Sequence, residues 1–138
     1  MTIHDLKIGD QSTYTRQITT EHIETFAALC GDSNPVHLND AYAEQTVFKG
    51  RIAYGMLVAG LISTIIGSQL PGDGSIYLSQ DLKFVKPVMA NDTITAEVTV
   101  EALDIDKNRI TLNTRCYNQA GEDVITGGAL VKLMPPKI

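Results

Sequence analysis

The chain has 138 residues, of which 43% are hydrophobic and 20% charged, a composition typical of an ordered globular protein. A formal net charge of −5 and a pI near 5.0, with no run of lysine or arginine, argue against a nucleic-acid-binding surface. The length and the absence of repeats or linkers predict a single domain over residues 1–138.

The ends and cysteines of the chain favour a cytoplasmic protein. The first ten residues, MTIHDLKIGD, lack the basic and apolar regions of a secretory signal. Cys30 and Cys116 have no metal-ligand spacing, so we expect reduced thiols and no metal site.

The first part of the chain predicts a strand followed by an amphipathic helix. Residues 12–18 can form the strand after a Gly-Asp turn. The sequence Thr19-Thr20-Glu21 is typical of a helix start, with hydroxyl caps followed by an acid. Apolar residues at helical spacing then predict a helix over residues 20–29, ending near Gly31.

An irregular stretch comes next. Pro35 disfavours helical geometry at Asn34, and the residues before it are turn formers. Asn39 and Asp40 can cap a short helix that runs through Gln45. The remainder is predicted to be a loop, and loops of this length in compact domains are usually functional or disordered.

Residues 55–70, GMLVAGLISTIIGSQL, form the most apolar stretch. They carry no charge and leave no clearly polar face, which predicts a helix buried on all sides. Gly60 and Gly67 would let other backbone approach it closely, and the Pro-Gly pair that follows would stop it. A membrane span is the alternative, but the strongly apolar part, residues 53–66, is shorter than the roughly 18–20 residues that a bilayer core requires. We therefore expect no membrane span.

After this helix, apolar residues alternate with polar ones, as in half-buried strands. Four strands are predicted, over residues 76–85, 93–102, 110–116 and 124–133. The turns between them, including the one at Asn91-Asp92, are short and indicate antiparallel neighbours. The expected fold class is α+β, a curved antiparallel sheet wrapped around one long central helix. Strand edges and the small size favour a homodimer.

Asp32 and His37 are the candidate catalytic pair. They lie five residues apart across a turn stiffened by Pro35, a spacing that can aim a carboxylate and an imidazole into one small space. Such a pair can bind a water, take one proton from it and deliver another. The alternative, which spacing leaves open, is that Asp32 and Asn34 cap the turn while His37 satisfies a carbonyl.

The start of the apolar helix is the second candidate. Its first N–H groups lack partners within the helix, and the helix dipole adds positive potential. Gly55 would let a ligand carbonyl approach closely, so its N–H could stabilise an enolate formed from a thioester. The alternatives are an ordinary helix-start glycine, a packing role for Tyr54 with its hydroxyl satisfied, and a Ser63 hydroxyl bonded to its own helix.

Two motifs resemble one known family. The sequence FAALCGDSNPVH, residues 26–37, is similar to the hydratase-2 motif of MaoC-like, (R)-specific enoyl-CoA hydratases. The sequence RIAYGML, residues 51–57, resembles the segment that leads into the central helix of that family. The order of elements also fits the family's single hot-dog fold over nearly the whole chain. The resemblance is closest to the short hydratases of the PhaJ type, which supply polyhydroxyalkanoate synthesis.

The resemblance implies that Asp32 and His37 activate water for reversible syn addition to a trans-2-enoyl-CoA, giving an (R)-3-hydroxyacyl-CoA without a cofactor. It also implies that the Gly55 N–H holds the thioester carbonyl, that Asn34 supports the turn, and that Ser63 has an auxiliary, orienting role. Members of the family are typically homodimers.

Three further positions carry expectations. The family commonly has histidine where this chain has Tyr54, which is bulkier and does not titrate near neutral pH. We expect activity to survive this difference with an altered pocket or pH profile. Ile66 and Val131 are predicted to help bound the acyl pocket.

Other functions remain open on the sequence. One is the same chemistry on a 3-hydroxyacyl-ACP, as in fatty-acid synthesis; another is a non-catalytic acyl-CoA-binding module, against which the intact acid–histidine pair argues. Thioesterases share the fold but would hydrolyse the thioester. A basic patch that could meet CoA phosphates or a carrier protein has four candidate members: Lys49, Arg51, Lys83 and Lys86.

Overall fold

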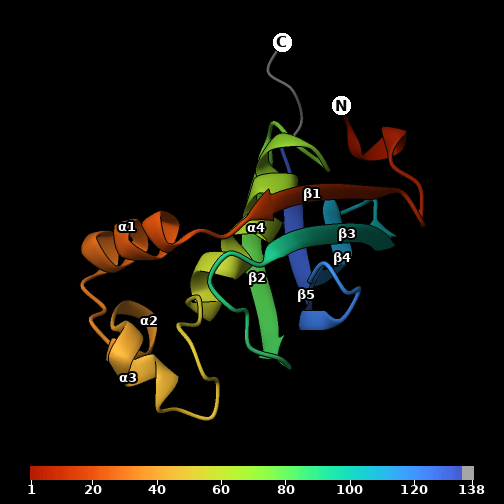
Figure 1. Cartoon of the computed structure of the whole chain (residues 1–138). Coiled ribbons are helices and arrows are strands. Elements are labelled where there is room, and N and C mark those ends of the chain that lie inside the picture. The colour runs from red at the N-terminus through yellow and green to blue at the C-terminus, as the bar shows by residue number, and fades with distance from the viewer. Residues whose placement is uncertain (135–138) are drawn as a thin grey trace.

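Within residues 1–134, which the computed structural model describes, an antiparallel five-stranded sheet packs against one long helix (Figure 1). The strands are β1 (Gln11–Gln17), β2 (Ser75–Phe84), β3 (Thr93–Asp104), β4 (Arg109–Tyr117) and β5 (Asp123–Leu133). The helices are α1 (Thr20–Cys30), α2 (Pro35–Leu38), α3 (Asp40–Glu44) and α4 (Gly55–Ser68), preceded by a 3-10 turn at Ile3–Asp5. The expected α+β class is confirmed.

The strands lie in the order β1-β3-β4-β5-β2, so β2 and β3 are not neighbours. The hairpins β3–β4 and β4–β5 are antiparallel as predicted. The prediction that Asn91-Asp92 joins two adjacent strands is wrong. The chain between β2 and β3 instead runs beside the segment that precedes α4, where the Ala53 N–H donates to the Val88 carbonyl and Ile52 pairs with Met89.

Alternating burial along β3 and β4 gives the sheet one apolar face, and α4 packs on it. The same alternation was predicted from the sequence, because successive side chains of a strand point to opposite faces. Five side chains of α4 fill the interface: Val58, Leu61, Ile62, Ile65 and Ile66. Full burial of each such side chain contributes about 1.5–3 kcal/mol.

One face of α4 remains exposed, and here the prediction of a helix buried on all sides is wrong. Met56 is 60% exposed, and Ser63 also faces outwards. A methyl group added to Gly60 or Gly67 would meet no atom of residues 1–134 within 4 Å. The curved sheet covers only part of the helix circumference. None of the helices in the described part of the chain has the length and apolarity that a membrane crossing requires.

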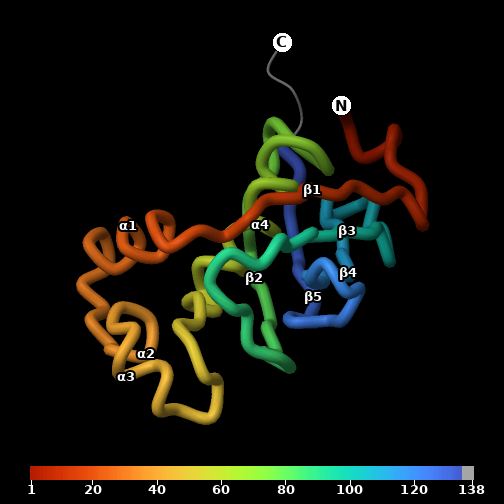
Figure 2. Tube along the Cα trace, in the orientation of Figure 1, coloured from red at the N-terminus to blue at the C-terminus, as the bar shows by residue number. Residues whose placement is uncertain are grey.

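Between β1 and α4 the chain leaves the sheet and forms α1, α2 and α3 beside it (Figure 2). The predicted helices are present: Thr19 caps α1 through the His22 N–H, and Asn39 caps α3. Gly31 ends α1 with a φ of 77°, which a residue with a side chain rarely adopts. The sequence did not predict α2, which Asn34 caps and Pro35 begins.

Candidate active site

Asp32 lies in the turn between α1 and α2, His37 lies within α2, and both line one cavity of about 670 Å³. Gly55 and Met56, at the start of α4, line the same cavity. Asp32 is exposed, whereas His37 is half-buried. The predicted pair and the predicted helix start therefore meet in one place.

The turn that carries Asp32 is held by its own polar side chains. Oδ1 of Asp32 accepts a hydrogen bond from the Asn34 N–H at 3.1 Å. Oδ1 of Asn34 in turn accepts one from the Val36 N–H at 3.2 Å, which begins α2. The second carboxylate oxygen of Asp32 accepts no hydrogen bond from residues 1–134, so it is available to a bound molecule.

His37 is fixed through one ring nitrogen. Its Nδ1 lies 2.7 Å from the carbonyl oxygen of Ile52. Because a carbonyl can only accept, Nδ1 carries the hydrogen, and in the neutral ring Nε2 then holds a lone pair. The capping contacts that the alternative requires are thus all present, yet within residues 1–134 they leave Nε2 of His37 and one carboxylate oxygen of Asp32 without a hydrogen-bond partner. No ion pair joins Asp32 to His37 in the described part of the chain, although both line the same cavity.

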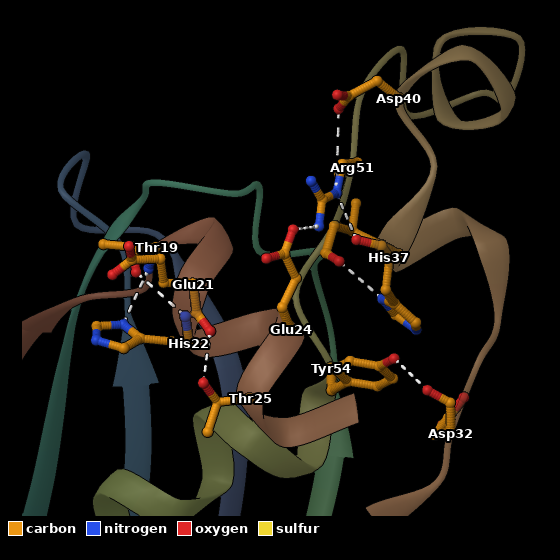
Figure 3. Close-up of polar contacts among 11 residues, drawn as sticks. Thr19, Glu21, His22, Glu24, Thr25, Asp32, His37, Asp40, Arg51 and Tyr54 are labelled. Carbon is orange, nitrogen blue, oxygen red and sulfur yellow. Dashed lines mark hydrogen bonds and ion pairs between the residues drawn. The ribbon is translucent and has the colours of Figure 1, made fainter. Parts of the chain in front are cut away.

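Tyr54 packs between the pair and α1. Its hydroxyl donates to the main-chain oxygen of Asp32 at 2.6 Å (Figure 3). Its ring centroid lies 3.9 Å from that of His37 and 5.0 Å from that of Phe26. The side chain is 4% exposed, and burial, reinforced by the negative charge of Asp32, raises the pKa of the phenol. Tyr54 therefore stays a neutral donor at physiological pH.

Arg51 is buried beneath the same turn. Its side chain is 8% exposed, and Nε donates to the main-chain oxygen of His37 at 2.6 Å. One guanidinium nitrogen, Nη2, lies 3.3 Å from a carboxylate oxygen of Glu24 on α1. Nε is also 4.0 Å from a carboxylate oxygen of Asp40 on α3, so the guanidinium joins three elements (Figure 3).

The basic patch is smaller than predicted. Arg51 is not part of it, because its guanidinium is turned inwards to protein partners. Lys86 forms an ion pair with Glu122, which lowers the pKa of that carboxyl. Lys49 and Lys83 are exposed.

Gly55 begins α4 with a free N–H. Tyr54, the N-cap residue, contributes no side-chain cap, and its carbonyl accepts from Leu57 and Val58. Within residues 1–134 the Gly55 N–H donates to no acceptor, as expected for the first residue of a helix. The ring of Phe84 lies against this glycine: a Cβ on Gly55 would be 2.6 Å from Phe84 Cε1.

Two further hollows adjoin the cavity of the pair. One, of about 410 Å³, shares His37 and Gly55 and carries Lys86 on its wall. The other, of about 390 Å³, runs between α4 and β2, shares Met56 and contains Ser63. All nine residues that line this second groove are uncharged.

Three predicted residues do not join the pair. Ser63 lies in the groove between α4 and β2. Ile66 and Val131, 2% and 0% exposed, belong to the packed core and do not line the cavity of Asp32 and His37.

Sequence reasoning missed the contacts of Arg51 and Phe84. The sequence places Arg51 in a surface basic patch, and no local signal indicates that its guanidinium turns to Glu24, Asp40 and the His37 carbonyl. Phe84 had no local signal, since its contact with Gly55 depends on how β2 lies against α4. No group of three or more potential metal ligands occurs in the described residues.

Comparisons with known proteins agree with this architecture. A family model described as "MaoC like domain" matches residues 7–121. An (R)-specific enoyl-CoA hydratase from Aeromonas caviae is 45% identical over 96% of this chain and 99% of its own length. A protein of the same name from Rhodospirillum rubrum is 48% identical over 92% of this chain and 88% of its own. The structure of R-hydratase PhaJ1 from Pseudomonas aeruginosa superposes with a TM-score of 0.92 at 40% identity, over 99% of this chain and 95% of that one. The expected hot-dog fold is confirmed.

Proposed function

The chain belongs to the MaoC-like domain family, and we propose that it is an (R)-specific enoyl-CoA hydratase. The reaction is the reversible syn hydration of a trans-2-enoyl-CoA to an (R)-3-hydroxyacyl-CoA, which makes the protein a hydro-lyase. Its product can supply polyhydroxyalkanoate or fatty-acid metabolism. The observation that carries the proposal is that Asp32 and His37 face one cavity beside the free N–H of Gly55.

The proposed chemistry uses Nε2 of His37 and the second carboxylate oxygen of Asp32. A water in the cavity would donate one hydrogen bond to the Asp32 carboxylate and one to Nε2 of His37. Nε2 takes a proton as the water oxygen bonds to C3 and the C2=C3 π electrons move towards the thioester oxygen. The proton then passes to C2 on the same face. Both proton transfers are supplied by protein side chains, so the proposed reaction needs no cofactor.

Gly55 is proposed to stabilise the negative charge that develops on the thioester oxygen. Its N–H has no partner in residues 1–134, and it opens a helix of 14 residues whose dipole is positive at this end. A preorganised donor of this kind contributes about 3–4 kcal/mol in other enzymes. Asn34 is proposed to hold the Asp32 turn, as its two hydrogen bonds indicate.

The two adjoining hollows suggest how the substrate lies. We place the CoA arm in the hollow that carries Lys86, because its half-exposed ammonium group can turn from Glu122 to a phosphate. The acyl chain then follows the uncharged groove along α4, where Ser63 has the auxiliary role proposed for it. Ile66 and Val131 would bound that acyl pocket from within the core.

A homodimer is part of the proposal. β2 is an edge strand, with one side of its backbone unpaired, and its exposed apolar side chains are Ile76, Tyr77, Leu78 and Phe84. The neighbouring face of α4 is open at Gly60 and Gly67. Pairing of β2 with β2 of a second copy would complete the sheet and cover this surface. Light scattering should report twice the chain mass of 15.0 kDa, and L78K should yield monomer; a monomeric parent would contradict the dimer.

We place the protein in the cytoplasm. Both cysteines are free thiols, Cys30 exposed and Cys116 buried, which suits a reducing compartment. Fractionation of cells that produce the untagged protein tests this placement.

The decisive assay is the loss of the conjugated enoyl-thioester absorbance when the purified protein meets crotonyl-CoA. D32N and H37A should each lose nearly all activity, because each removes one of the two groups that hold the water. D73N and H4A are matched controls, since both residues are exposed and lie outside the cavity. Chiral analysis of the product should give the R isomer.

The same assay separates the alternatives. A faster reaction with an enoyl-ACP than with the matching enoyl-CoA would favour a dehydratase of fatty-acid synthesis. Release of free thiol from a saturated acyl-CoA would indicate a thioesterase. Binding of acyl-CoA without turnover of any enoyl thioester would contradict the hydratase and favour a binding module.

A further inference from the structure

We propose that Arg51 and Tyr54 are positioning residues that set the geometry of the catalytic pair by binding the main-chain carbonyls of Asp32 and His37. The catalytic part of this inference rests on the proposed hydratase function. Arg51 does not line the catalytic cavity, whereas Tyr54 forms part of its wall; in the proposed role each acts through the reacting residue whose carbonyl it binds.

Tyr54 holds the Asp32 side of the turn. Its hydroxyl donates at 2.6 Å to the main-chain oxygen of Asp32, whose side chain carries the proposed catalytic carboxylate. Its ring also lies against the imidazole of His37, with centroids 3.9 Å apart and planes inclined by 32°. One buried side chain therefore contacts both members of the pair and limits the distance between them.

Arg51 holds the His37 side. Its Nε donates to the main-chain oxygen of His37 at 2.6 Å, while Glu24 and Asp40 lie 3.3 and 4.0 Å from the guanidinium. A charged donor forms a stronger hydrogen bond than a neutral one, and with 8% of its side chain exposed this Arg51 bond is shielded from water.

The segment from Arg51 to Tyr54 acts as one strap. Between its two side-chain donors, the Ile52 carbonyl accepts from Nδ1 of His37 and so fixes the imidazole tautomer. The strap leads directly into α4, whose first N–H is proposed to bind the thioester oxygen. The same stretch of backbone therefore positions the two catalytic side chains and the N–H that is proposed to bind the thioester carbonyl.

The surroundings explain why such a strap is needed. The catalytic turn lies on helices set beside the sheet rather than within its core, and α2 is a single turn of four residues (Figure 2). Asp32 itself is exposed. Local hydrogen bonds shape the turn, and three hydrogen bonds with residues 51–54 connect it and α2 to the segment that leads into α4.

The kinetic test compares Y54F and R51M with the parent enzyme on crotonyl-CoA. Y54F keeps the ring and loses the donor; R51M keeps most of the stem and loses the charge. We expect kcat to fall between about tenfold and 100-fold in each, as small misplacements of reacting groups do, with KM changed less than about threefold. R51K, which keeps a charged donor, should recover part of kcat. Y14F is the matched control, since it keeps the ring and removes a hydroxyl that, within residues 1–134, accepts a hydrogen bond from Arg16 and lies outside the cavity, so both constants should stay unchanged.

A second readout does not depend on activity. In ¹⁵N spectra of the histidine rings, the parent should show His37 with Nδ1 protonated, and R51M and Y54L should show a mixture of tautomers. This measurement separates the two proposals. If the parent protein is inactive but shows the expected tautomer, and the variants lose that tautomer, the hydratase function is rejected and the positioning role of residues 51–54 is kept. Parent-like kcat in Y54F and R51M, or an unchanged tautomer in R51M and Y54L, would overturn the inference. The inference would also be overturned if the fall in kcat of each variant were no larger than the fraction of that variant that is unfolded.

Discussion

The ring of Phe84 occupies the space that a side chain on Gly55 would need, because a Cβ there would lie 2.6 Å from Phe84 Cε1 and 2.7 Å from Cδ1. Phe84 is 53% exposed, so the ring can swing away at modest cost in stability. In the proposed site, however, a displaced ring would enter the hollow that Gly55 and His37 share.

We therefore expect G55A to retain its fold and to lose most of its hydratase activity, by about tenfold or more. The double variant G55A/F84A should recover much of that loss, since the new methyl group then fits the space left by the ring. Crotonyl-CoA hydration by the three variants, with F84A alone as the control, measures this coupling. A double variant as slow as G55A would show that the ring contact is not the cause.

The two thiols should differ in reactivity. Cys30 is exposed and lines the cavity of Asp32 and His37, whereas Cys116 lies in the core with no exposed surface. A thiol reagent at neutral pH should label one cysteine in the native protein and both in denaturant. The label on Cys30 should also slow hydration, because it adds bulk to the cavity wall, and C30A should abolish native labelling. Rapid labelling of both thiols in native protein would contradict this burial.

Stability should fall at alkaline pH through Cys116. Burial raises the pKa of this thiol from 9.0 to about 12. Above pH 9 the unfolded chain has released this proton and the folded chain has not, so rising pH stabilises the unfolded state relative to the folded state. The free energy of unfolding should drop by at most roughly 1.4 kcal/mol per pH unit between pH 9 and 12, and not below pH 9. Urea unfolding of the parent and C116V at pH 7 and 10.5 tests this; C116V, close in volume, should lose less stability, and an equal loss in both proteins would refute the assignment.

Ile66 provides a test of the acyl pocket. The side chain is 2% exposed in the core, so I66A should cost about 2–5 kcal/mol of stability and leave a cavity. If that cavity opens on the groove beside Ser63, the ratio of kcat/KM for octenoyl-CoA to that for crotonyl-CoA should rise. I62A, in the same helix and also buried, is the control for stability loss. An unchanged ratio would remove Ile66 from the pocket.

Much of the fold could be predicted because its signals are local. Period-two alternation located β3 and β4, and capping residues such as Thr19 and Asn39 located the starts of α1 and α3. Strand order had no such signal. The Asn91-Asp92 turn is typical of a hairpin, yet β2 pairs with β5 while β3 pairs with β1 and β4, so the chain crosses to another part of the sheet between β2 and β3.

The candidate site was predictable in its residues but not in its supports. The spacing of Asp32 and His37 pointed to a shared space, and both line one cavity. Arg51 could not be placed, since a cation usually lies at the surface and the two carboxylates that meet its buried guanidinium come from separate helices, α1 and α3. The open face of α4 was also missed. An apolar composition predicts that the helix surface is buried, but it does not tell whether the same chain buries all of it.

The strand order has a consequence for how the molecule folds. β3, β4 and β5 are joined by short connections, whereas Thr15 of β1 meets Thr95 of β3 across 80 residues of chain. Contacts so distant in sequence form slowly, because a long loop must close before they contribute any stability. We expect the three-stranded meander to appear first and β1 to join late, drawing in the segment from 18 to 54. The catalytic cavity would then be among the last features to assemble, and a folding intermediate with most of its sheet would still be inactive.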